Sequence, residues 1–256
     1  MEKKLEGKTA IITGSDAGIG QAMAIEFARH GANVIINYLL DEDGAQQTFH
    51  QVQQQGQKAL VVQADSSNEM QVEAMFDSAI AKFGEIFILV NNAGIEASGT
   101  KVADLSTEAW YEAFAHSVDG YFFCARRFIN HRLEHGGKGK IINITPVQQH
   151  LPHSGAADYY CTNGAILNLT RMLALEVAEN GICVNNLAPG LVAAPFNLDA
   201  AGSQATHRKQ VQGIPMKRAA RPEEIAKLAL FLSSPDADYC SGATFTMDGA
   251  LSQQVG

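Results

Sequence analysis

Short apolar segments rich in β-branched residues alternate with longer segments of helical periodicity along the whole chain of 256 residues. Strands and helices in strict alternation form right-handed β–α–β crossovers, which require a parallel sheet covered by helices on both faces. The near-continuous apolar character of the short segments agrees with burial on both faces. The sequence therefore predicts one α/β domain over residues 1–256, built on a doubly wound parallel sheet of seven strands.

The expected strands cover residues 8–13, 33–38, 58–65, 85–94, 140–145, 182–190 and 243–247. The expected helices cover residues 18–32, 41–55, 69–84, 107–132, 156–179 and 222–232. Residues 191–214 have no strong pattern, and two interpretations stay open for them: a lid over a ligand, or a surface loop.

Composition excludes several classes of function. The formal charge of −8 argues against nucleic acid as a partner, because phosphate contacts require clustered Lys and Arg. No apolar run approaches the ~18 residues of a membrane span, and the N-terminus has no secretory signal. The four cysteines are scattered without metal-binding spacing, which indicates reduced thiols and a cytoplasmic location.

A glycine-rich turn, TGSDAGIG, follows the first expected strand and opens the first expected helix. Its glycines allow the backbone to approach a pyrophosphate at a helix N-terminus, although such a turn alone is a weak signal. Ligands of parallel sheets bind beyond the carboxyl ends of the strands. Asp65, residues 91–94 and residues 189–190 end three other strands at that edge, so the sequence predicts a nucleotide site there.

Four segments, TGxxxGIG, NNAG, VNNLAPG and MDGA, stand in one order and spacing from end to end of the chain. In this combination the chain resembles the short-chain dehydrogenase/reductase family, close to its glucose-dehydrogenase-like branch. The resemblance implies a Rossmann-type fold, NAD or NADP as cofactor, a small-molecule substrate or ligand, and a homotetramer paired through the helices at 107–132 and 156–179. It implies cofactor contacts for these residues: Gly14, Ser15, Asp16, Gly18, Ile19, Gly20, Tyr38, Asp65, Ser66, Asn91, Ala93, Gly94, Pro189 and Gly190.

The choice between NAD and NADP is unresolved at the end of the second expected strand. An acidic residue there binds a ribose hydroxyl, and a nearby Arg suits a 2′-phosphate. By the resemblance these two positions are Tyr38 and Leu39, both neutral, so we expect little preference. Asp41 lies further along and is expected to cap the following helix.

The resemblance places the family's catalytic Tyr at Tyr159. The family's Lys, Ser and Asn fall on Asn163, Pro146 and Ser117, and the Thr that holds the nicotinamide falls on Ala194. Asn carries no charge to favour a phenolate, and an unperturbed phenol of pKa ~10 is only ~0.1% ionised at pH 7. Pro146 offers neither hydroxyl nor N–H. Thr145 is an imperfect substitute, because successive strand residues point to opposite faces.

Three functions stay open from the sequence. The chain is an oxidoreductase with weak, specialised or lost hydride transfer, a nucleotide- or metabolite-binding protein without turnover, or a catalyst of a non-redox reaction that uses Tyr159 as an acid. His150 and His153 in the loop beside the substrate side are expected to be ordinary polar residues, and no metal site is predicted. The aromatic residues 121–123 are interpreted as core or subunit contacts.

Overall fold

The computed structural model describes residues 3–94, 97–147, 154–193 and 210–253. Seven strands form one sheet in the order β3-β2-β1-β4-β5-β6-β7, and every neighbouring pair is parallel. The predicted seven-stranded parallel sheet is confirmed. The strands are β1 (Thr9–Ile12), β2 (Asn33–Tyr38), β3 (Ala59–Gln63), β4 (Ile88–Asn91), β5 (Gly139–Ile144), β6 (Ile182–Pro189) and β7 (Thr244–Met247).

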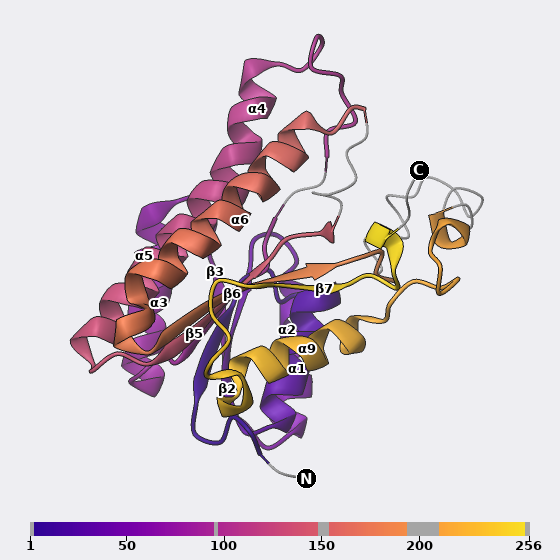
Figure 1. Cartoon of the computed structure of the whole chain (residues 1–256). Helices are drawn as coiled ribbons and strands as arrows, with labels where there is room; N and C mark the ends of the chain where they lie inside the picture. Colours follow the sequence, from indigo (N-terminus) through magenta and orange to yellow (C-terminus); the bar gives the residue numbers. More distant parts are fainter. Residues whose placement is uncertain (1–2, 95–96, 148–153, 194–209, 254–256) are drawn as a thin grey trace.

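Helices cover both faces of the sheet, as Figure 1 shows. One face carries α1 (Gly18–Arg29), α2 (Glu42–Gln54) and α9 (Pro222–Ser233). The other carries α3 (Glu69–Phe83), α5 (Gly120–Glu134) and α6 (Ala157–Val177), and α4 (Thr107–Phe114) projects above the sheet beside α6. This is the three-layer α/β arrangement of a Rossmann-type domain.

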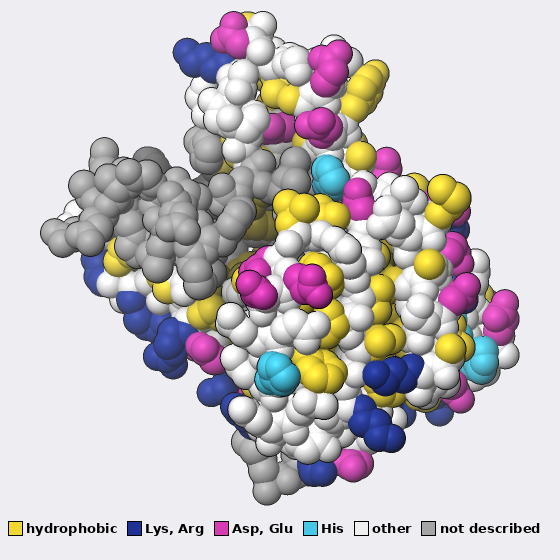
Figure 2. All heavy atoms as spheres, turned by 180° about the vertical axis from the view of Figure 1, so that it is seen from behind, with side chains coloured by type: hydrophobic (Ala, Val, Ile, Leu, Met, Phe, Trp, Pro, Cys, Tyr) yellow, Lys and Arg dark blue, Asp and Glu magenta, His cyan; other side chains and the backbone are white. Residues whose placement is uncertain are grey.

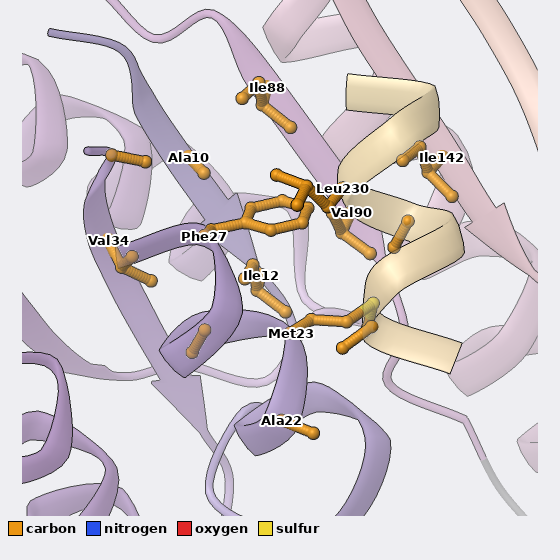
Figure 3. Close-up of a cluster of buried hydrophobic side chains, with 14 of the residues drawn as sticks. Ala10, Ile12, Ala22, Met23, Phe27, Val34, Ile88, Val90, Ile142 and Leu230 are labelled. Atoms are coloured by element: carbon orange, nitrogen blue, oxygen red, sulfur yellow. The ribbon is translucent and has the colours of Figure 1, made fainter. Parts of the chain in front are cut away.

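Alternate residues of each strand supply the two apolar cores. Ile12 and Val90 point toward α1 and α9, where they pack with Phe27 and Leu230 (Figure 3). Ile11, one residue before Ile12, points to the opposite core, with the helices α3, α5 and α6. Because both faces are covered, apolar residues predominate in the strands, as the sequence pattern indicates.

Local signals set where the helices begin and end. Asp41 accepts a hydrogen bond from Gly44 N–H at 2.9 Å, which confirms its expected role as the cap of α2. Asn68 and Ser106 cap α3 and α4 in the same way. The first helix ends at Arg29, and Gly31, the residue expected to stop it, takes a φ of 100° that ends the helical path.

The helix expected over residues 107–132 is interrupted. A π-helical segment, η1 (Ala115–Asp119), separates α4 from α5 and shifts the register of the helix by one residue. Such wide turns occur frequently at functional sites, and a periodicity argument does not detect one residue of extra turn. Ser117 lies within η1 and is buried.

The order of strands determines where a ligand can bind. The chain runs outward from β1 to β3 on one side and from β4 to β7 on the other, so the strand order reverses between β1 and β4. Loops at the carboxyl ends of these two strands diverge and leave a crevice, which is the usual ligand position in open α/β sheets.

Candidate active site

A cleft of about 850 Å³ opens at the carboxyl edge of the sheet, where the strand order reverses. The predicted site residues on its wall are Gly14, Asp16, Gly18, Ile19, Asp65, Ser66, Ala93, Gly94, Ser117, Pro146, Tyr159, Asn163, Pro189 and Gly190. Four predicted residues, Ser15, Gly20, Tyr38 and Asn91, are not on this wall. Ala194, His150 and His153 lie outside the described residues.

The glycine-rich turn closes one end of the cleft. Gly14 and Gly18 adopt φ values of 59° and 58°, which favour glycine. A Cβ on Gly20 would lie 2.1 Å from Gly14 O, so glycine is required at this close approach of helix and loop. Helix α1 begins without a capping side chain and has no acidic residue in its first turn. Its first N–H groups are therefore suited to bind an anion.

Buried polar side chains hold the glycine-rich turn in place. Ser15 is fully buried; its hydroxyl donates to Ile12 O at 2.8 Å and accepts from Asn37 N–H at 3.2 Å. Asn37 Oδ1 accepts from Gly14 N–H at 3.2 Å. Asn92 Nδ2 donates to Gly14 O at 2.9 Å from the other side. Ser15 thus supports the glycine-rich turn from the interior of the protein. Asn37, which no sequence motif singled out, holds the same turn.

At the end of β3, Ser67 orients the carboxylate of Asp65. Asp65 Oδ1 accepts from the backbone N–H of Ser67 at 2.8 Å and from its hydroxyl at 2.7 Å. His116 Nδ1 lies 3.7 Å from the same oxygen. Asp65, Ser66 and His116 all line the cleft at this place.

Asn91, at the end of β4, faces the interior. Its Nδ2 donates to Asn143 Oδ1 at 2.9 Å, and Asn143 Nδ2 donates to Thr170 Oγ1 at 2.9 Å. These amides tie β4 to β5 and β5 to α6 behind the cleft. Asn91 Oδ1 is buried and has no hydrogen-bond partner among the described residues. Its expected contact with the cofactor stays a prediction.

Tyr159 and Asn163 lie one turn apart on α6, and both line the cleft. The side-chain amide of Asn163 is bound to its own helix, because Nδ2 donates to Tyr159 O at 2.6 Å. Asp158, the residue before Tyr159, is buried and accepts from Ser98 N–H at 3.1 Å, which fixes the start of α6. The position beside the tyrosine is therefore occupied by a neutral amide turned toward the backbone.

The end of β5 offers little to an oxygen of a substrate. Thr145 is fully buried, and its hydroxyl donates to Asn186 Oδ1 at 2.8 Å on the side away from the cleft. This agrees with the expected alternation of strand side chains. Pro146, which does line the cleft, has no donor.

Tyr121, which the sequence analysis treated as a core or subunit contact, lines the cleft. Its hydroxyl donates to Ile144 O at 2.9 Å, at the end of β5. Burial raises the pKa of Tyr121 far above that of an ordinary phenol, and the neighbouring Tyr159 raises it further. Tyr121 is therefore a neutral phenol next to Tyr159.

Known proteins resemble this chain over nearly its full length, including the residues that line the cleft. The family model described as enoyl-(acyl carrier protein) reductase matches residues 14–252. Glucose 1-dehydrogenase 2 of Bacillus subtilis is 39% identical over 251 residues, which are 98% of this chain and 97% of that protein. 3beta-hydroxysteroid dehydrogenase 1 of Eggerthella lenta is 38% identical over 256 residues, 100% of this chain and 98% of that protein.

Solved structures agree in fold. The acetoin dehydrogenase of Enterobacter cloacae superposes with a TM-score of 0.87 at 35% identity, covering 96% of this chain and 95% of the other. A short-chain dehydrogenase/reductase from Serratia marcescens gives a TM-score of 0.90 at 30% identity, covering 97% of this chain and 99% of the other.

The chain belongs to the short-chain dehydrogenase/reductase family. The expected resemblance, including its glucose-dehydrogenase-like character, is confirmed.

A nicotinamide dinucleotide, which the family implies, fits the donor groups of the cleft. The uncapped start of α1, with Gly18 on the cleft wall, suits a pyrophosphate. Asp65 is oriented at the end of β3.

The cleft wall carries acidic side chains and no permanent positive charge among the described residues. Among the described residues that line it, the ionisable ones are Asp16, Asp65, His116, Tyr121 and Tyr159, without any Lys or Arg. In the described part of the chain no group of three His, Cys, Asp or Glu side chains is placed to hold a metal ion. No helix among the described residues is both long enough and apolar enough to span a membrane.

Both described ends of the expected lid reach the cleft. Leu191, Val192 and Gln210 line it, and Val192 forms a bridge with Ala220. Residues 194–209 are not described, so the lid itself stays a prediction.

Proposed function

We propose that the protein binds a nicotinamide dinucleotide in the cleft and slowly transfers hydride between it and a small carbonyl or alcohol, with Tyr159 as the remaining proton-transfer group. The hydrogen bond from Asn163 Nδ2 to Tyr159 O carries this proposal. It leaves a neutral amide where the family has a cation, while the groups that suit the nucleotide are retained.

The bound nucleotide supplies the hydride; the residues of this chain hold the substrate and move its proton. Tyr159 can donate a proton to a carbonyl oxygen as a neutral phenol. It is a poor base for the reverse reaction, because the family's Lys is replaced by Asn163 and the described cleft wall contains no Lys or Arg to stabilise a phenolate. Pro146 gives the substrate oxygen no second donor. Acid–base assistance is worth roughly 10²–10⁴ in rate and one oxyanion donor roughly 10²–10³, so a low rate follows.

A second function, nucleotide or metabolite binding without turnover, is favoured by the same two substitutions. If neither Asn163 nor Pro146 assists, the fold retains a binding site and loses its reaction. The two functions differ in one observable. When the protein holds a reduced nucleotide together with a carbonyl compound, a slow enzyme oxidises the nucleotide in a single turnover, and a binding protein leaves it reduced.

Two measurements test the proposal. Calorimetric titration with NAD, NADH, NADP and NADPH is expected to give heat of binding for at least one nucleotide at micromolar to millimolar concentration. A panel of ketones, sugars and secondary alcohols is then expected to give slow turnover that Tyr159→Phe abolishes. The absence of heat and of thermal stabilisation with all four nucleotides contradicts the binding, and fast turnover that survives Tyr159→Phe contradicts the mechanism.

We also propose that the protein is a homotetramer, as the family resemblance implies. Large apolar side chains are exposed on the two helices expected to pair, with exposed fractions of 45% for Leu133 on α5, and 52% and 77% for Met172 and Leu175 on α6. Phe122 of α5 is exposed as well, under the guanidinium of Arg126.

On the face shown in Figure 2, Lys and Arg side chains are scattered among acidic, apolar and neutral ones.

A further inference from the structure

The cleft has an acidic end between the glycine-rich turn and the carboxyl end of β2. Its wall there includes Asp16, Asn37 and Leu39. In a domain of this type the end of the second strand lies beside the ribose of the adenosine. The groups at this end of the cleft therefore decide which adenosine ribose the protein accepts.

Asp16 is held rigidly at this place. Gln21 Nε2 donates to Asp16 O at 3.2 Å and to Thr48 Oγ1 at 2.8 Å, which connects the turn to α1 and α2. A Cβ on Gly44 would lie 2.7 Å from Asp16 O, so the backbone of Asp16 packs directly against the start of α2. The backbone of Asp16 is thus held against α1 and α2, and this places the residue, which lines the cleft, at a fixed point of the wall.

The start of α2 adds further negative charge. Asp41 caps the helix, and Glu42 and Asp43 occupy its first turn. Burial raises the pKa of Asp16, and the charge of Asp41 raises it further, so the two carboxylates are close enough to interact. No Lys or Arg is present among the described cleft residues to offset them.

The two residues at the end of β2 cannot select a ribose by charge. The ring of Tyr38 is buried in the core beneath α1 and α2. Leu39 lines the cleft with an exposed fraction of 42%, and its side chain forms no hydrogen bond. This end of the cleft still contains an acceptor for a ribose hydroxyl, which is the carboxylate of Asp16 in the glycine-rich turn.

We propose that Asp16 is the residue that determines nucleotide specificity: its carboxylate accepts a hydrogen bond from a hydroxyl of the adenosine ribose and repels a 2′-phosphate, so the protein binds NAD in preference to NADP. This inference rests on the proposed binding of a nicotinamide dinucleotide in the cleft. It departs from the expectation of little preference, which considered Tyr38 and Leu39 alone.

The physical reason is the cost of an uncompensated anion. A phosphate monoester carries a charge of about −1.5 to −2 at pH 7, and its recognition usually depends on Arg or Lys. Beside the half-buried carboxylate of Asp16 and the acidic start of α2, a 2′-phosphate would lose hydration and gain no cationic partner. A ribose hydroxyl at the same place is a donor, and a carboxylate is its best acceptor.

Calorimetric titration of the full chain with NAD and with NADP tests the inference. The wild-type protein is expected to bind NAD at least about tenfold more tightly. Asp16→Asn keeps the size of the side chain and removes its charge, so it is expected to weaken NAD binding, strengthen NADP binding and bring the two affinities within about threefold. Asp104→Asn, an equal charge change at an exposed residue outside the cleft, is the matched control and is expected to leave the ratio unchanged.

A second measurement uses the wild-type protein alone and holds even if Asp16→Asn fails to fold. At 1 M NaCl the screening length falls to roughly 3 Å, so the affinity ratio of NAD to NADP is expected to narrow as the salt concentration rises from 0.05 M.

Leu39→Arg is expected to strengthen NADP binding selectively, because it adds a guanidinium beside the ribose.

Each outcome has one meaning. Equal wild-type affinities for the two nucleotides, or an affinity ratio that Asp16→Asn leaves unchanged, overturn the role of Asp16 and leave the proposed function standing. Failure of both nucleotides to bind overturns the proposed function and this inference together.

Discussion

The hydroxyl of Tyr121 connects the helix after η1 to the last carbonyl of β5. It donates to Ile144 O at 2.9 Å in a buried environment, two residues before Pro146. This contact helps to fix the wall of the cleft beside Tyr159. Periodicity does not predict this contact, because the π-helical segment changes which side of the helix residue 121 occupies and leaves no sign in the sequence pattern.

We predict that Tyr121→Phe lowers the free energy of unfolding by about 1–3 kcal/mol, because it leaves the buried carbonyl of Ile144 without a donor. Urea unfolding of the purified protein measures the change. Tyr239→Phe removes the same hydroxyl from a fully exposed side chain and serves as control, with no change expected. Equal stability of Tyr121→Phe and wild type would show that water replaces the phenol at no cost.

His131 on α5 gives the protein a dependence on pH. Its Nε2 accepts from Ile86 N–H at 3.0 Å, which requires an unprotonated nitrogen. Burial lowers the pKa of His131, the neighbouring His135, Arg132 and Arg127 lower it further, and Glu85 opposes them weakly. A folded-state pKa below the unfolded value of ~6.5 means that the unfolded chain binds the proton more tightly.

We predict that His131 contributes stability above pH ~6.5 that is lost as the pH falls through that value toward the lower folded-state pKa. His131→Gln retains an acceptor for Ile86 N–H and does not titrate. Urea unfolding at pH 7.5 and 5.5 is expected to show a smaller loss of stability for this variant than for wild type. An identical loss in the two proteins would assign the pH dependence to other groups.

At the scale of elements, two helical glycines differ in whether an alanine can replace them. A Cβ on Gly20 at the start of α1 would lie 2.1 Å from Gly14 O, whereas a Cβ on Gly164 within α6 meets nothing within 4 Å. Both lie in helices, so helix propensity favours alanine equally at each. The close approach decides the difference.

We predict that Gly20→Ala destabilises the protein by roughly 1–3 kcal/mol or more and abolishes nucleotide binding, because α1 must move away from the turn. Gly164→Ala is expected to stabilise it by about 1 kcal/mol. Thermal unfolding with and without nucleotide compares the pair. A stable Gly20→Ala variant that binds as wild type would refute the assigned geometry of the turn.

The order and type of the elements were predictable from the sequence, since buried parallel strands and covering helices have different periods. The cap at Asp41 and the clustering of strand ends were predictable for the same local reasons. The inward direction of Ser15 and Asn91 was not predictable, because it depends on partners 22 and 52 residues away along the chain. The contribution of Asp16 became visible only once α2 was placed against the turn.

At the scale of the whole molecule, the exposed apolar residues of α5 and α6 bear on assembly. We predict a tetramer of four 27.5 kDa chains by light scattering at micromolar concentration. Leu175→Glu, at a side chain 77% exposed on α6, is expected to produce smaller species without unfolding the subunit. Met70→Glu on α3, at 79% exposure, is the control and is expected to leave the assembly intact. A wild-type mass of one chain would contradict the prediction.

The central claim is that the cleft retains a nucleotide site but lacks the charge and the donor that efficient hydride transfer requires. The most direct test is the turnover of the double variant Pro146→Ser with Asn163→Lys on the panel of ketones, sugars and secondary alcohols. The claim predicts a rise over wild type of roughly 10²-fold or more, because the variant restores a donor for the substrate oxygen and a cation beside Tyr159. A double variant that binds nucleotide and remains as slow as wild type on every compound would contradict it.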